Sequence, residues 1–211
     1  MKTDALIERL AADAAPVRRS AAARTLALGL GVGAFVSAAA MLAWIGIRAD
    51  SATAMAGWPY WMKFAYTLAV ALIALGAVER LARPGARARA AWQSLPLGAM
   101  ALGALVQWLA TPDAEHMHLL LGVSHTVCPW RIVALAMPVF AGLLWSLRRL
   151  APTRPAVAGA AAGVLAGAAG AWIYAFACAE SSVAFVAVWY TAGIALTGLL
   201  GALIGRWALR W

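Results

Sequence analysis

The sequence predicts an all-α integral membrane protein: a polytopic bundle of six transmembrane helices preceded by a short amphipathic helix. Two observations lead to this fold class. The 211 residues are 64% hydrophobic and only 12% charged, with a mean hydropathy of +0.81, whereas soluble domains carry about 25% charge. Six continuous apolar stretches also fill most of the chain, each of about the 20 residues that a helix needs to cross a bilayer.

The amphipathic helix is expected near the N-terminus, within a cytoplasmic head of residues 1–24. Thr3 or Asp4 can cap a helix over residues 4–15, and helical spacing places Leu6, Ile7 and Leu10 on one face. So short a segment cannot build its own core. We therefore expect its apolar face to dock into the groove of a partner, the alternative being a helix that lies on the lipid surface.

The transmembrane domain is expected to occupy residues 25–211. Its spans are predicted at residues 25–47, 61–81, 92–110, 127–147, 156–177 and 185–206. Small residues recur every fourth position in three of these spans, which lets helix backbones approach closely. These stripes are Gly29, Gly33 and Ser37, then Gly159, Gly163 and Gly167, and finally Gly193, Thr197, Gly201 and Gly205.

The net charge of +9 comes from basic residues that lie mostly on one side of the predicted membrane. All but three of the 17 lysines and arginines lie before the first span, in the second and fourth connections, or at the C-terminus; the exceptions are Arg48, Lys63 and Arg131. Because basic residues collect on the cytoplasmic side, both termini are expected in the cytoplasm of a bacterium, with the chain in its inner membrane. The charge is therefore no sign of direct nucleic-acid binding.

Two cysteines are the leading candidates for chemistry. Cys128 precedes the apolar run of the fourth span and Cys178 follows that of the fifth, so both are expected at the outer membrane boundary. His125 and Glu180 lie beside them in sequence and are candidate metal helpers, because thiolate and imidazole suit soft and transition metals. Three interpretations stay open: a thiol pair that senses metal or oxidant, a static disulfide, and inert buried thiols. No cofactor is expected to be required, although a soft or transition metal ion fits the cysteine pair.

Several segments resemble the NrsF family of membrane anti-sigma factors, which are negative regulators of extracytoplasmic-function sigma factors. The resemblance begins with Met-Lys-Thr-Asp-Ala-Leu-Ile-Glu-Arg-Leu-Ala at residues 1–11 and continues with Cys128-Pro129. It includes residues 147–155 before a Gly/Ala-rich helix, and Cys178-Ala179-Glu180-Ser181 leading to residues 185–190. The resemblance implies a regulator that is no enzyme, whose head holds a sigma factor and whose paired cysteines sense stress. Within the head, the helical wheel favours Leu6, Ile7 and Leu10 as the sigma-binding residues.

An alternative interpretation uses the same cysteines differently. A membrane redox protein would exchange electrons between this thiol pair and quinone or an external thiol. A transporter is disfavoured because no charged residue lies near the middle of any span. A homo-oligomer is left open.

Overall fold

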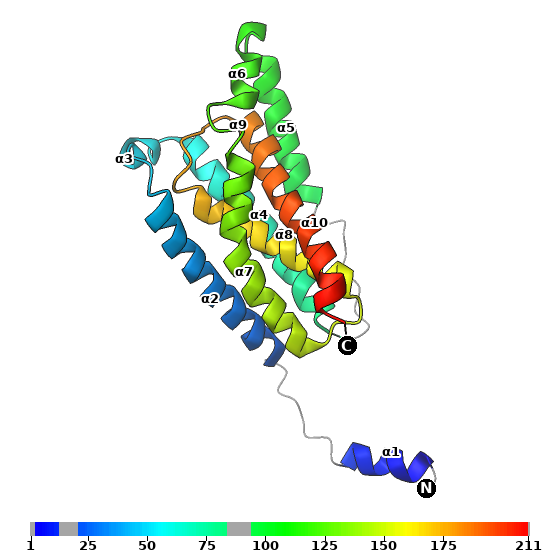
Figure 1. Cartoon of the computed structure of the whole chain (residues 1–211). Coiled ribbons are helices and arrows are strands. Elements are labelled where there is room, and N and C mark those ends of the chain that lie inside the picture. Colours follow the sequence, from blue (N-terminus) through cyan, green and yellow to red (C-terminus); the bar gives the residue numbers. More distant parts are fainter. Residues whose placement is uncertain (1–2, 13–20, 84–93, 211) are drawn as a thin grey trace.

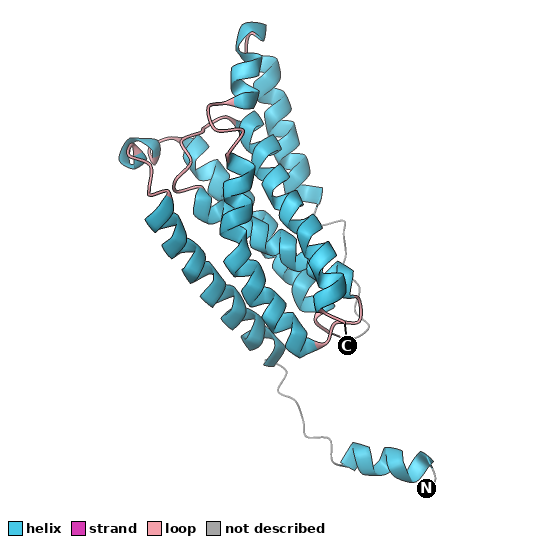
Figure 2. Ribbon diagram, viewed as in Figure 1, coloured by secondary structure: helices cyan, strands magenta, loops and turns pink. Residues whose placement is uncertain are grey.

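The computed structural model describes residues 3–12, 21–83 and 94–210, and within these ranges every regular element is helical (Figures 1 and 2). The longer helices are α1 (Thr3–Ala12), α2 (Ala21–Trp44), α4 (Trp58–Leu81), α5 (Ser94–Ala110), α7 (Cys128–Leu150), α8 (Pro155–Tyr174) and α10 (Thr191–Ala208). The short ones are α3 (Ser51–Ala54), η2 (Asp113–Glu115), α6 (His116–Leu121), α9 (Val183–Phe185) and the π-helical η3 (Val186–Tyr190). The all-α prediction is confirmed for these residues.

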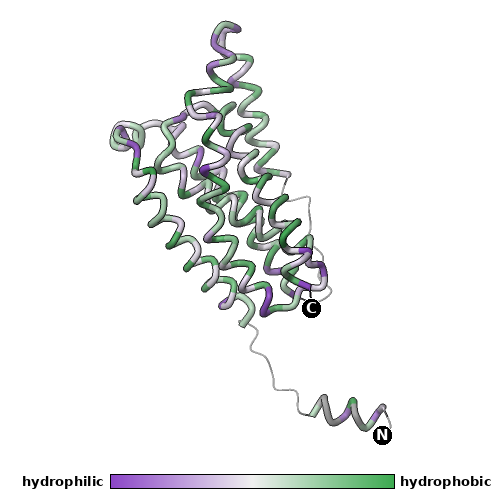
Figure 3. The backbone as a smooth tube through the Cα atoms, in the orientation of Figure 1, coloured by the Kyte–Doolittle hydropathy of each residue, from purple (hydrophilic) through white to green (hydrophobic). Residues whose placement is uncertain are grey.

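Five helices, rather than the six predicted, are long and apolar enough to cross a membrane in the described part of the chain. They are α2, α4, α7, α8 and the continuous helix of α9, η3 and α10 over Val183–Ala208. The predicted span at residues 92–110 corresponds to α5, whose 17 described residues extend over about 26 Å; residues 92 and 93 lie outside the described part. Hydrophobic residues dominate the long helices, and most hydrophilic ones lie toward their ends (Figure 3).

Helix α8 forms the centre of the bundle, where it packs against α10, α7 and α4. Its contact with α10 uses two of the predicted small-residue stripes. A Cβ atom added to Gly159 would lie 2.7 Å from the Cα of Gly205, so neither position has room for a side chain. These stripes bring the two backbones together as expected.

Helix α2 packs chiefly on α7, and this interface is held by hydroxyl groups as well as by small residues. Ser37 donates a hydrogen bond to the carbonyl of Leu135 at 2.7 Å, and Ser146 donates one to the carbonyl of Thr25 at 2.8 Å. Between these bonds, a Cβ added to Gly33 would lie 2.5 Å from the Cα of Val139. The two helices are thus tied to each other along most of their length.

The start of α2 and the end of α10 lie at the same end of the bundle (Figure 1). The opposite end carries α3, η2 and α6, which are short helices within the connections between the longer helices. Helix α5 lies at the edge of the bundle and leaves an apolar groove of about 820 Å³ against α4. The two cysteines lie at the end of α7 and α8 that is remote from the N-terminus of α2.

Candidate functional site

The two cysteines meet where α7 begins and the segment after α8 ends. Cys128 is the first residue of α7, just before Pro129 in the first turn, a position that proline favours. Cys178 lies four residues beyond the end of α8 and is 2% exposed, whereas Cys128 is fully buried. Both are free thiols, and Cys128 donates a hydrogen bond to the Cys178 sulfur. The two sulfurs, both expected at the same boundary, are therefore neighbours.

The surroundings of Cys178 favour its thiolate. The hydrogen bond from Cys128 and the positive charge of Lys63 lower the pKa of Cys178 to about 6, although burial opposes this shift. The buried hydroxyl of Tyr190 also lies beside the sulfur and has no hydrogen-bond partner of good geometry. Tyr190 ends the π-helical turn η3, and such turns occur frequently at functional sites.

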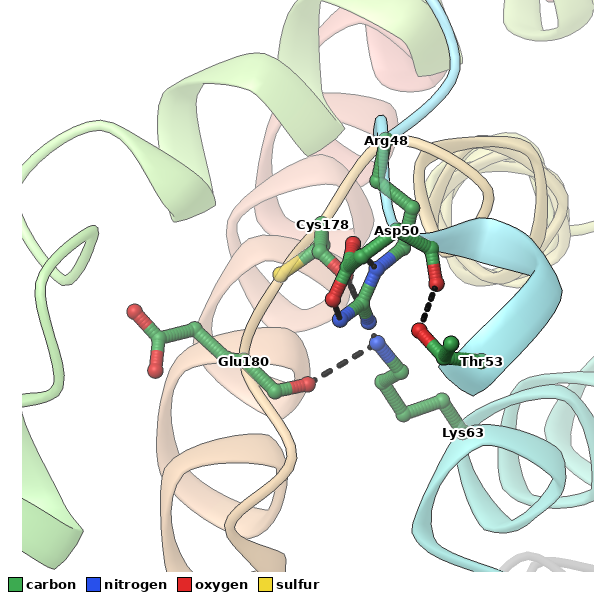
Figure 4. Close-up of polar contacts among 6 residues, drawn as sticks. All are labelled: Arg48, Asp50, Thr53, Lys63, Cys178 and Glu180. Atoms are coloured by element: carbon green, nitrogen blue, oxygen red, sulfur yellow. Dashed lines mark hydrogen bonds and ion pairs between the residues drawn. The ribbon is translucent and has the colours of Figure 1, made fainter. Parts of the chain in front are cut away.

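Lys63 is the most unexpected residue near the cysteines. It lies in the second turn of α4 and is fully buried. Its ammonium donates hydrogen bonds to the carbonyls of Cys178 at 2.8 Å and Glu180 at 2.9 Å. Figure 4 shows the side chain reaching from α4 to the irregular segment that carries both residues.

Arg48 approaches the same carbonyl from the connection between α2 and α3. Its guanidinium donates to the carbonyl of Cys178 at 3.2 Å and forms a two-pronged ion pair with Asp50, at 2.7 and 2.6 Å. The hydrogen bonds from Arg48 lower the pKa of the Asp50 carboxyl. The carbonyl of Cys178 thus accepts hydrogen bonds from two cationic side chains on different elements (Figure 4).

Glu180 turns its carboxylate away from the sulfurs. One carboxylate oxygen accepts hydrogen bonds from the backbone of Val123 at 2.8 Å, and from the backbone and hydroxyl of Ser124 at 3.0 Å each. Gly122 makes this possible, because it has a φ of 52°, a conformation that favours glycine. A Cβ at Gly122 would also lie 2.5 Å from the carboxylate. Glu180 therefore joins the segment before α7 to the segment after α8.

His125, the other candidate metal helper, packs on the ring of Trp189 at 5.5 Å between centroids. Its Nδ1 atom is buried without a hydrogen-bond partner. Among the described residues, no group of three or more His, Cys, Asp and Glu side chains gathers where it could hold a metal ion. The structure thus brings together the two sulfurs alone as close candidate ligands in this region, with Glu180 engaged elsewhere.

The sequence did not single out Lys63 and Arg48 as site residues. A signal for them was nevertheless present, since the charge pattern left Arg48, Lys63 and Arg131 as the three basic residues at the outer level. The third of these, Arg131, forms a hydrogen bond with the Tyr174 hydroxyl. All three therefore contact the segments that surround the cysteines.

The expected sigma-binding residues lie in α1, which stands apart from the bundle in Figure 1. The described part of this helix spans Thr3–Ala12, and residues 13–20, which include the end of the helix predicted over residues 4–15, lie outside the described part. Ile7 is 59% exposed, as a docking residue should be before it meets its partner. The side chains of Leu6 and Leu10 lie outside the described residues.

These features define an all-helical protein that carries a buried pair of thiols at one end of a bundle of apolar helices. The chain belongs to the NrsF family, described as "Negative regulator of sigma F", which matches residues 10–211. The resemblance seen in the sequence is thereby confirmed.

Two relatives are similar to the chain over its full length. The "Anti-sigma-F factor NrsF" of Caulobacter vibrioides is 40% identical over 214 residues, covering 100% of both chains. The "Probable anti-sigma-F factor NrsF" of Azospira oryzae is 39% identical over 215 residues, again covering 100% of both. No solved structure matches the chain.

Proposed function

We propose that this protein is an anti-sigma factor of the bacterial inner membrane, with both termini in the cytoplasm. Its head, residues 1–24, sequesters an extracytoplasmic-function sigma factor through Leu6, Ile7 and Leu10. Reaction of Cys128 and Cys178 with metal or oxidant releases that sigma factor. The observation that carries the proposal is the full-length similarity to two proteins named as anti-sigma-F factors, one of them as probable.

The arrangement of the helices supports the proposed place in the membrane. Five helices have the length and apolarity for crossing. Exposed arginines, namely Arg148, Arg149, Arg206 and Arg210, lie near the C-terminal ends of α7 and α10. This is the end of the bundle at which α2 begins (Figure 1). Since basic residues favour the cytoplasmic side, the head and any sigma factor that it binds belong on that side.

The thiol geometry supports the proposed sensing step. The thiolate is the form of cysteine that reacts with oxidants and binds metals, and the low pKa of Cys178 favours that form. A signal at the cysteines must stabilise the released state relative to the bound state. A hundredfold loss of sigma affinity would need about 2.7 kcal/mol of such coupling, which lies within the usual range for allostery.

Sigma retention is tested by a detergent pull-down from the native host. The full-length protein is compared with a version lacking residues 2–16, with Ile7→Asp on the apolar face of α1, and with Glu8→Gln as the matched control. A sigma factor should be retained by the full-length protein and the control, and lost from the other two. Retention by the version without residues 2–16 would move the contact to the inner loops or the C-terminus. Retention by none would remove the anti-sigma proposal.

Sensing is tested on the same complex by adding a soft metal or an oxidant. The wild-type protein should release its sigma factor, whereas a protein with Cys128→Ser and Cys178→Ser should keep it. Release from the double variant at the wild-type dose would show that the thiols have no part in the response.

A membrane thiol/quinone redox protein is the second candidate function. The groove between α4 and α5 favours it, because about 820 Å³ of apolar space falls within the usual range for small-molecule sites. Val183, five residues beyond Cys178, lines this groove. Quinone-dependent turnover of the purified protein, abolished by Cys178→Ser, would support this function, and its absence would exclude it.

A further inference from the structure

The burial of Lys63 calls for an explanation. A charged group without exposure to water is costly unless it is paired or well hydrogen-bonded. The ion pairs found among the described residues are those of Arg48 with Asp50 and of His116 with Asp113, so none of them involves Lys63. The nearby Glu180 carboxylate bonds to Val123 and Ser124 instead. The hydrogen-bond partners of the Lys63 ammonium are therefore two backbone carbonyls.

Those two carbonyls belong to the residue that carries the second thiol and to its near neighbour. Cys178 and Glu180 lie in an irregular stretch between α8 and α9. One helical hydrogen bond reaches into this stretch, from the backbone N–H of Cys178 to the carbonyl of Tyr174 at 3.0 Å. Cys128, in contrast, begins a long helix that continues beyond it, and its backbone N–H is held by the carbonyl of Ser124 at 2.9 Å. The carbonyls of Cys178 and Glu180 accept hydrogen bonds from side chains on other elements, so the path of the backbone beyond Cys178 depends on those side chains.

We infer that Lys63 is a positioning residue of the cysteine pair: by holding the carbonyls of Cys178 and Glu180, it keeps the Cys178 sulfur against Cys128. Hydrogen bonds from a charged donor are roughly twice as strong as neutral ones, and here two of them act on positions two residues apart. Arg48 adds a third bond, at 3.2 Å, to the carbonyl of Cys178. The inference rests on the proposed use of the cysteine pair, and it adds the residue that brings the pair together.

The test measures whether the two thiols can be captured by one atom. Phenylarsine oxide contains arsenic(III), which forms two As–S bonds with a close pair of thiols and releases one water, without any change of oxidation state. It is titrated into the reduced, full-length protein in detergent. Alkylation of single thiols by N-ethylmaleimide and thermal unfolding are followed in parallel. Cys128→Ser serves as the variant that cannot be captured.

Three variants separate positioning from a merely structural role. Lys63→Met keeps much of the side-chain volume but loses both hydrogen bonds, whereas Lys63→Gln keeps a shorter, neutral donor. Arg131→Gln is the matched control, because Arg131 is also basic and at the same level but bonds to Tyr174. Dithiol capture should weaken at least about tenfold in Lys63→Met and about threefold in Lys63→Gln. Arg131→Gln should behave like the wild type, and after unfolding both thiols should be alkylated in all three variants.

Wild-type capture by Lys63→Met would overturn the inference, even if that variant unfolds at a lower temperature. If Lys63→Met does not fold, Lys63→Gln decides, and its capture at the wild-type concentration would overturn the inference equally. Dithiol capture does not involve the sigma factor. Failure here would therefore leave sigma retention intact, and failure of sigma retention would leave the capture result standing.

Discussion

Replacing Gly33 with alanine should weaken the contact between α2 and α7, because the added methyl group has no room in the interface. The added Cβ would lie 2.5 Å from the Cα of Val139 and 2.7 Å from the carbonyl oxygen of Pro138. Both are backbone atoms that no rotamer change can move. An ordinary contact needs at least 3.4 Å, so the two helices must separate, and overpacking of this kind costs about 1–3 kcal/mol.

Gly31→Ala is the matched control, because a Cβ at Gly31 meets nothing within 4 Å. There, alanine should stabilise the helix by up to about 1 kcal/mol, owing to its higher helix propensity. Because both variants gain the same helix propensity, they should differ by the overpacking cost of about 1–3 kcal/mol in unfolding free energy, with Gly33→Ala the less stable. Unfolding in detergent, followed by tryptophan fluorescence, measures this difference. Equal stability of the two variants would refute the close packing of α2 on α7.

Three further predictions concern the segments around the cysteines. Gly122→Ala should destabilise the protein by about 1–3 kcal/mol, since alanine disfavours a φ of 52°; thermal unfolding at the wild-type midpoint would contradict this. Glu180→Gln should cost about 1–2 kcal/mol by weakening the charge-assisted bonds to Val123 and Ser124, whereas the exposed Glu115→Gln should change nothing, and equal unfolding curves for the two would count against the bonds. Because thiolate is the nucleophile and the pKa of Cys178 is lowered to about 6, alkylation of Cys178 should decline only as the pH falls through about 6. A midpoint near the ordinary thiol value of about 8.5 would show that its surroundings do not stabilise the thiolate.

The features that could be predicted from the sequence are those with a regular period. The spacing of Gly159, Gly163 and Gly167 places them on one helix face whatever the rest of the chain does, and the structure uses that face against α10. The alternating direction of consecutive helices likewise predicts that Cys128 and Cys178 lie at one end of the bundle, where the structure has them. In both cases, the prediction needed only the regular geometry of helices.

The features that could not be predicted depend on irregular backbone. Lys63 lies in the second turn of α4, near a helix end, where a lysine would ordinarily extend its charge toward water. It is buried instead, and its ammonium bonds to carbonyls more than one hundred residues away in the chain. Glu180 was expected beside a metal, yet the positive φ of Gly122 turns a loop so that its N–H groups meet the carboxylate.

Because α2 fits closely on α7, a small rotation at one end of α2 would displace its other end by a larger distance. With 24 residues, α2 is about 36 Å long. A tilt of about 5° around its distant end would therefore move its first turn sideways by about 3 Å. Backbone atoms rather than adjustable side chains form the contact at Gly33. Side-chain rearrangement between α2 and α7 would therefore compensate for little of such a tilt. A modest rearrangement beside Cys128 would thus be magnified where the chain leaves the bundle toward α1.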